Sequence, residues 1–181
     1  MRKTITTVVA LILFSGLLSA KGIIFELKGS YFSPSEKAFK DIYGGGITYG
    51  GEVTFDMWRN IELWLGGSYF TKKGKLTFTK EETKLELIPL GGGLKFRISK
   101  GNVIFYGGAG LHYYQYKESN PIGKTSKGRV GYIGKLGSFV KVSGGLLIDL
   151  YVRYSYCKLK PADYKVNIGG IEGGIGLGYE F

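Results

Sequence analysis

The sequence predicts an all-β fold, in which eight antiparallel strands close into an up-and-down transmembrane β-barrel. Three observations predict it: the chain ends in a strand pattern with an uncharged apolar face, alternating segments precede it, and short and long connections alternate between them. In the last nine residues, GGIGLGYEF, one face carries Ile175, Leu177, Tyr179 and Phe181. Such a face suits contact with lipid, although this segment alone could also be the last strand of a soluble sandwich.

The beginning of the chain favours export. Arg2 and Lys3 precede an apolar stretch at residues 8–18, and small residues follow before Lys21. This order of charge, apolar core and small residues is typical of a secretory signal peptide, and the apolar part is too short to span a bilayer. We therefore expect residues 1–20 to be a cleaved signal peptide and residues 21–181 to form one domain.

The composition agrees with an exported, curved sheet. The 181 residues include 31 glycines, 15% aromatic residues and one cysteine, Cys157, so no intramolecular disulfide can form. The formal net charge is +11, and it becomes +9 without Arg2 and Lys3. A basic balance predicts an anionic partner, but an exported chain seldom meets nucleic acid, so we expect none.

Eight segments alternate in hydropathy, and we expect no helix after the leader. The expected strands are residues 23–32, 46–57, 61–70, 83–98, 103–116, 130–142, 146–157 and 166–181. Tight turns are expected at residues 58–60, 99–102 and 143–145, and longer lysine-rich connections fall between them. Short turns at one end and long loops at the other are typical of outer-membrane hairpins, whose even strand number lets the sheet close.

The faces of the strands indicate where the charges go. In segment 46–57, Ile47, Val53 and Phe55 share one face, whereas Glu52 and Asp56 share the other. A soluble sandwich would bury the apolar face, but a small membrane barrel inverts that assignment and places the charges inside. Segment 83–98 is the least regular, because Leu85 and Leu87 interrupt its apolar phase.

At this level of detail the sequence resembles a known family. Together with the leader, the segments FYGGAGLHYY (105–114), LYVRYSY (150–156) and IGLGYEF (175–181) resemble the small outer-membrane β-barrel family of OmpX, the OmpA membrane domain and OmpW. The resemblance covers essentially the whole mature chain. It implies that the barrel-assembly machinery reads the last strand, with Ile175, Leu177, Tyr179 and Phe181 as the matching signal. It also implies a Gram-negative type outer membrane as the location.

An eight-stranded barrel has an interior that side chains nearly fill, so we do not expect an open pore. Charges of both signs share the inward phase, and unpaired ions there would be prohibitive, so we expect a lumen network of ion pairs. Its candidate members are Glu26, Lys28, Glu52, Glu62, Lys135, Asp149, Arg153 and Glu172, and the same phase also holds Asp56, Lys95 and Arg97. The alternative is that the inward glycines leave a polar path for small solutes.

His112 is the sole histidine and shares the inward phase of its strand. It is the one candidate base for a lipid A-modifying enzyme, a chemistry found in some small barrels, but no serine or carboxylate is placed beside it by sequence. One histidine and one cysteine cannot make the usual zinc site, and no phosphate-binding loop is present. We expect no catalytic residues, no cofactor and no metal.

The sequence thus supports a non-enzymatic, monomeric outer-membrane barrel with a structural or surface-interaction role. The lysines of the long loops would meet membrane lipid and the phosphates of lipopolysaccharide, or an anionic polymer during adhesion. Two alternatives stay open: a narrow channel or carrier for small molecules, which the resemblance to OmpW allows, and a lipid A-modifying enzyme that uses His112. Cys157 is expected as a free thiol near the outer rim.

Overall fold

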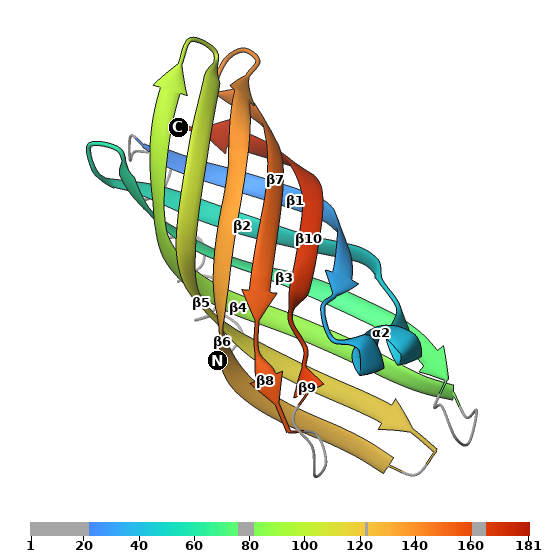
Figure 1. The fold of residues 1–181 in the computed structure, drawn as a ribbon. Helices are drawn as coiled ribbons and strands as arrows, with labels where there is room; N and C mark the ends of the chain where they lie inside the picture. The colour runs from blue at the N-terminus through green and yellow to red at the C-terminus, as the bar shows by residue number, and fades with distance from the viewer. Residues whose placement is uncertain (1–21, 76–81, 122, 161–165) are drawn as a thin grey trace, which may run out of the picture.

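Eight strands close into one antiparallel barrel in the computed structural model, which describes residues 22–75, 82–121, 123–160 and 166–181 (Figure 1). The expected signal peptide lies outside the described residues. The barrel strands are β1 (Ile23–Pro34), β2 (Gly46–Trp58), β3 (Ile61–Lys75), β4 (Glu82–Lys100), β5 (Val103–Asn120), β6 (Gly123–Lys141), β7 (Leu146–Tyr156) and β10 (Gly170–Glu180). Each pairs with its neighbours along the chain, so the predicted up-and-down barrel is confirmed.

The barrel closes where the last strand meets the first. Phe25 on β1 lies opposite Tyr179 on β10. Beyond the ladder, the Phe181 amide donates to the Ile23 carbonyl at 2.9 Å, and the Gly22 amide donates to the Phe181 carbonyl at 3.1 Å. Since every strand then has two partners, the barrel presents no open edge, which is what a sheet inside a bilayer requires.

The two ends of the barrel differ. The three short turns lie at the end where Gly22 meets Phe181, and each uses left-handed backbone, at Arg59 (φ 49°), Gly101 (φ 61°) and Gly145 (φ 87°). The other end carries the longer connections, including the helix α2 (Lys37–Tyr43) and a small sheet of β8 (Lys158–Leu159) and β9 (Val166–Asn167). Figure 1 shows these elements gathered at the end of the barrel away from the C-terminus.

The expectation of no helix after the leader was wrong, because α2 interrupts the first long connection. Phe39 and Tyr43 lie four residues apart, so one helical face carries both rings, and their centroids are 5.1 Å apart. Both side chains are buried against the barrel mouth. The helix is only seven residues long, so tertiary burial of this face, rather than helix propensity, stabilises it. Among the described residues, no helix has the length and apolar character needed to cross a membrane.

The last predicted strand, residues 166–181, is in fact two strands. β9 pairs with β8, and β10 begins only at Gly170. The break occurs because the Asn167 side chain replaces the ladder: its Oδ1 accepts the amides of Cys157 at 3.0 Å and of Gly169 at 3.1 Å. β5 and β6, by contrast, are longer than predicted and pair up to Asn120 and Gly123, so their hairpin projects from the barrel (Figure 1).

The outer surface of the barrel is apolar. Large hydrophobic side chains of every barrel strand are exposed, among them Leu27, Leu65, Leu94, Leu111, Leu136, Leu150 and Leu177. Exposed tyrosines lie in the strand halves nearer the long connections, at Tyr31, Tyr49, Tyr69, Tyr113, Tyr154 and Tyr156. Toward the short turns lie Trp58, Phe96, Phe105, Tyr179 and Phe181. An apolar band between two aromatic girdles is the expected surface of a barrel in a bilayer.

The structure also explains the irregular phase of β4. Leu85, Leu87 and Pro89 point inward and are buried, whereas Leu90 and Leu94 point outward. Both faces are apolar because the barrel interior is itself apolar near the long connections. The side chains of β4 therefore alternate regularly between the inside and the outside, although their hydropathy does not alternate.

Candidate functional site

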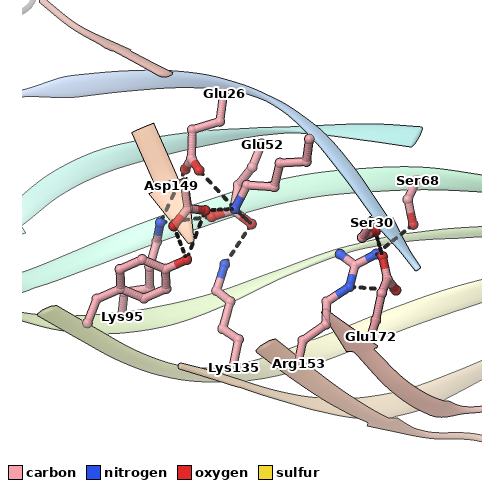
Figure 2. Close-up of polar contacts among 11 residues, drawn as sticks. Glu26, Ser30, Glu52, Ser68, Lys95, Lys135, Asp149, Arg153 and Glu172 are labelled. Atoms are coloured by element: carbon pink, nitrogen blue, oxygen red, sulfur yellow. Dashed lines mark hydrogen bonds and ion pairs between the residues drawn. The ribbon is translucent and has the colours of Figure 1, made fainter. Parts of the chain in front are cut away.

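A cluster of six ionisable side chains fills the centre of the barrel (Figure 2). We call it the central cluster, and its members are Glu26, Lys28, Glu52, Lys95, Lys135 and Asp149. They come from β1, β2, β4, β6 and β7, and all are buried. Five of them belong to the predicted lumen set, and Lys95 shares their inward phase. The cluster holds three lysines and three carboxylates, so its formal charge is zero.

The distances within the central cluster show a connected network. Lys28 Nζ lies 2.9 Å from Glu26, 3.1 Å from Asp149 and 3.5 Å from Glu52. Glu52 also contacts Lys95 at 2.8 Å and Lys135 at 2.6 Å. Because removing ions from water costs several kcal/mol each, such a group is tolerated only when every charge has close partners. The network therefore ties five strands together in one register.

Aromatic residues complete the central cluster. The Tyr106 hydroxyl donates to the two Asp149 oxygens at 2.8 and 3.0 Å. Lys135 Nζ lies 3.6 Å from the centroid of the Trp64 ring, and Lys95 Nζ lies 4.8 Å from that of Tyr106. Lysines above aromatic faces gain a cation–π attraction in a desolvated site. The sequence placed these rings on the inward phase but gave no sign of which cation each would meet.

A second group lies nearer the long connections. Arg153 contacts Glu172 through two bonds, Nε to Oε2 at 2.8 Å and Nη2 to Oε1 at 2.6 Å, and Figure 2 shows this bidentate pair. The hydroxyls of Thr48, at 2.8 Å, and Ser30 also donate to Glu172. The Ser68 hydroxyl accepts a bond from Arg153 at 2.9 Å. The sequence placed Thr48 and Ser68 on the same faces as Glu52 and Glu62, but none of the three hydroxyl residues was a candidate member of the lumen network.

Glu62, a predicted member of the lumen network, lies in a third group nearer the short turns. Arg97 contacts Glu62 at 2.7 Å, Asp56 at 2.9 Å and Glu180 at 3.7 Å. Glu62 is fully buried, while Arg97 is partly exposed. The predicted set is thus divided among three levels of the lumen, and the structure joins Glu62 to Arg97 rather than to the central cluster.

Two small cavities lie between the central cluster and the barrel mouth. Their volumes are about 20 Å³ and 10 Å³, and both are lined by Ser68, His112, Arg153 and Glu172. A cavity of this size holds about one water molecule. The side chains of the described residues therefore fill the lumen at this level nearly completely.

His112 is buried between other rings. Its ring centroid is 5.6 Å from that of Trp64 and 5.9 Å from that of Tyr114. Its Nδ1 has no hydrogen-bond partner among the described residues. The carboxylate that lines the same cavities, Glu172, is already held by Arg153. A base for lipid chemistry would need access to lipid and an orienting partner, and His112 is enclosed inside the barrel.

An apolar cap closes the end of the barrel nearer the long connections. We define this cap by its buried side chains, which are Phe32, Phe39, Tyr43, Phe70, Leu85, Leu87, Tyr114, Tyr116, Cys157, Leu159, Val166 and Ile168. They come from barrel strands, from α2 and from the β8–β9 sheet. Cys157, expected as a thiol near the outer rim, is a buried member of the cap.

Hydroxyl groups hold α2 on the cap. The Tyr43 hydroxyl lies 3.4 Å from that of Thr83, which donates to Glu118 at 3.2 Å, and the Tyr116 hydroxyl also donates to Glu118. Burial raises the pKa of Tyr43 and of Tyr116 above the ordinary tyrosine value. Within the described part of the chain, no three His, Cys, Asp or Glu side chains are grouped to hold a metal ion.

The four residues of the predicted assembly signal lie on the outer face of β10 and at the chain end. Ile175, Leu177, Tyr179 and Phe181 are exposed. The ring of Phe181 contacts Phe25 of β1 with a centroid distance of 6.1 Å, and that of Tyr179 at 4.8 Å. The terminal aromatic residues therefore lie at the seam between the first and last strands.

Comparison with known proteins agrees with this geometry. No family model and no curated protein matches the sequence. Solved structures do match, including Neisserial surface protein A, at 15% identity and a TM-score of 0.69 over 89% of this chain and 98% of that one. The outer membrane protein OprG of Pseudomonas aeruginosa matches at 16% identity and 0.68, over 89% and 97%. Ail, the attachment invasion locus protein of Yersinia pestis, matches at 14% and 0.57, over 90% and 100%.

The chain has the fold of the small outer-membrane β-barrels. The suspected resemblance is confirmed at the level of the fold, and the match extends over nearly the whole of each barrel. At these identities the likeness fixes the architecture, whereas the task of the protein must be argued from its own residues.

Proposed function

We propose that this protein is a monomeric, non-enzymatic outer-membrane barrel whose exposed cations contact the phosphates of lipopolysaccharide. The observation that carries the proposal is the contrast between a filled lumen and a basic exterior. The charges inside are paired across the barrel and covered by the apolar cap. The charges outside, at the end with the long connections, face solvent. We therefore expect a partner to bind at the outer surface rather than in the lumen.

The exterior at this end is strongly basic. Exposed cations occur at Lys37, Lys40, Lys73, Lys84, Lys117, Lys124, Lys127, Arg129, Lys158 and Lys160. Lys73, Lys117 and Lys124 lie on the projecting parts of β3, β5 and β6, above the tyrosine girdle. A cation near an anionic lipid surface contributes about 1 kcal/mol at low salt, and salt reduces this attraction. Several such cations together give useful affinity for a phosphate-bearing surface.

A structural neighbour supports an anionic partner. Ail, which shares the fold at 16% identity and a TM-score of 0.54, has been solved in complex with the heparin analogue sucrose octasulfate. Adhesion to sulfated or phosphorylated polymers would use the same cations as lipopolysaccharide. The membrane surface is favoured here, because the cations stand directly above the apolar band.

Binding of purified lipopolysaccharide to the folded barrel tests the proposal. At low salt the double variant Lys117→Gln/Lys124→Gln should bind about thirtyfold more weakly, because two cations of about 1 kcal/mol each are lost. The control is Arg59→Gln/Lys100→Gln, which removes two exposed cations at the short-turn end. Equal losses in both variants would contradict a site at the long-connection end.

Planar-bilayer recordings test the channel alternative. The filled lumen predicts a folded barrel without steady conductance, whereas a stable open level would favour the channel. Labelled lipopolysaccharide incubated with the wild type and with His112→Ala tests the enzyme alternative. We expect unchanged lipid in both samples, and wild-type conversion that His112→Ala abolishes would overturn the non-enzymatic assignment.

A further inference from the structure

The outer wall of the barrel carries a groove on one sector, formed by β5, β6, β7 and β10. The groove has a volume of about 560 Å³ and is lined by Gly107, Gly108, Gly134, Lys135, Leu136, Val152, Arg153, Tyr154 and Ile171. Lys135 and Arg153 contribute backbone, since their side chains make ion pairs inside the lumen. The surface offered to the bilayer is therefore glycine backbone flanked by apolar side chains.

The groove exists because its floor has no side chains. Gly134 faces outward between Ala109 on β5 and Tyr154 on β7. A Cβ built at Gly134 would meet no atom within 4 Å. Gly107 forms another part of the floor beside Leu136. Larger neighbours such as Tyr154 and Ile171 stand above this floor, so the depression is the width of a missing side chain.

A second depression lies beside the first, toward the short turns. It is shallow and open, and it shares Leu136 and Val152 with the first. Its other lining residues include Phe105, Ser138 and Leu150, which lie lower on the same strands. The two depressions lie within the apolar band on either side of the outward pair Leu136 and Val152.

A cation lies beyond the first groove, toward the long connections. Along β7 the outward side chains above the groove are Tyr154 and Tyr156, and exposed Lys158 follows on β8. Lys158 Nζ lies 5.5 Å from the centroid of the Tyr156 ring. Lys158 lies four positions beyond Tyr154, so in an extended strand their Cα atoms are on the order of 13 Å apart, and the ammonium lies beside Tyr156. An aromatic interface followed by a cation is a suitable environment for a lipid phosphate.

We propose that this groove binds one acyl chain of lipid A, whose phosphate lies at Lys158. The inference rests on the proposed outer-membrane location, because the long-connection end then faces the leaflet that contains lipopolysaccharide. A chain held in the groove gains dispersion contacts with Leu136, Val152 and Ile171. Charge complementarity at Lys158 selects a phosphate-bearing lipid.

Native mass spectrometry of the detergent-folded barrel tests this site, with purified lipid A as the probe. The variant Gly134→Phe fills the groove, and its matched control is Gly29→Phe on β1. Gly29 also faces outward, and a Cβ there would also meet no atom within 4 Å. We expect the wild type and Gly29→Phe to retain one lipid A, and Gly134→Phe to retain at least about tenfold less, which is about 1.4 kcal/mol of binding.

The variant Lys158→Gln gives a second measurement, because it leaves the groove residues unchanged. Its control is Lys100→Gln. We expect Lys158→Gln to weaken lipid A retention, while Lys100→Gln leaves it unchanged. Equal retention by wild type and Gly134→Phe would overturn the groove, and equal retention of lipid A and of lipid A without its phosphates would overturn the phosphate contact at Lys158. Heat-modifiable gel mobility shows whether each variant has folded. A wild type that is folded but binds no lipid A contradicts only the lipid site, whereas a wild type that does not fold contradicts the proposed membrane barrel.

Discussion

Glu52 is the residue on which the central cluster most depends, because its carboxylate contacts Lys28, Lys95 and Lys135. The inward phase of its strand could be read from the alternation of β2, and that reading predicted a charged lumen. The partners could not be predicted, because they depend on the register of five strands around a closed barrel. For the same reason, the sequence could not predict that Glu62 pairs with Arg97 and lies outside the central cluster.

Replacing Glu52 with Gln should destabilise the barrel by about 3 to 5 kcal/mol, because three buried lysines would share two carboxylates. Urea unfolding of the barrel in lipid vesicles measures this change. Adding Lys135→Met should recover part of the loss, since it removes the cation left without its nearest partner.

The matched control for Glu52→Gln is Glu86→Gln. Glu86 pairs with Lys84 at 2.7 Å on the exposed part of β4. An ion pair in water contributes little, so we expect no measurable shift of the unfolding midpoint. A loss as large as that of Glu52→Gln would contradict the role given to burial.

At the scale of elements, α2 and the β8–β9 sheet were not predicted, although they form much of the apolar cap. Phe39 and Tyr43 have the four-residue spacing of a helix, but one such pair in a long connection is a weak signal. The helix forms because these two side chains are buried against the barrel mouth, a surface that exists only in the tertiary structure. The inward leucines of β4 have the same explanation, because they face the cap.

The cap should open at alkaline pH. Burial raises the pKa of Tyr43 and Tyr116 above the ordinary value of 10, so the folded cap keeps both phenols protonated. Below pH 10 the phenols are neutral whether the cap is closed or open, and stability does not change. Above pH 10 the open state ionises first, and the cap loses stability as the pH rises.

Tyrosinate absorbance measures this titration, with Tyr43→Phe/Tyr116→Phe as the reference. The difference between wild type and reference should show no ionisation at the ordinary tyrosine pKa and should appear only at higher pH. A difference curve with its midpoint at pH 10 would show that these phenols are not buried.

The terminal strand β10 gives a test at the same scale. Its outward residues carry the proposed assembly signal and close the barrel against β1. Deleting Phe181 or replacing Tyr179 with Asp should abolish assembly in the outer membrane, whereas Tyr179→Phe should assemble normally. Heat-modifiable mobility of the membrane fraction measures assembly, and normal folding of Tyr179→Asp would reject the signal.

At the scale of the whole molecule, the barrel separates two kinds of electrostatics. Paired charges in the lumen are shielded from salt, whereas the exposed lysines at the long-connection end are screened within about 10 Å at 0.1 M ionic strength. Added salt should therefore weaken the binding of lipopolysaccharide more than it changes the stability of the barrel.

Raising the salt concentration from about 0.1 to 1 M should weaken lipopolysaccharide binding strongly while the urea midpoint of the barrel changes little, because the Debye length falls from about 10 to 3 Å. Titrations of binding and of unfolding in the same buffers measure the two effects. A parallel fall of both would indicate that the lumen is open to solvent ions.

The sequence by itself determined the architecture, because a period of two, the alternation of short and long connections and the apolar outward face depend only on local order along the chain. It also determined which residues face inward. Only the tertiary structure decided which charges pair, that α2 and the β8–β9 sheet cover the mouth, and that Gly134 forms the floor of a groove. These features depend on strand register around the closed barrel and on contacts between residues far apart in the chain, and neither is encoded in the hydropathy of one strand.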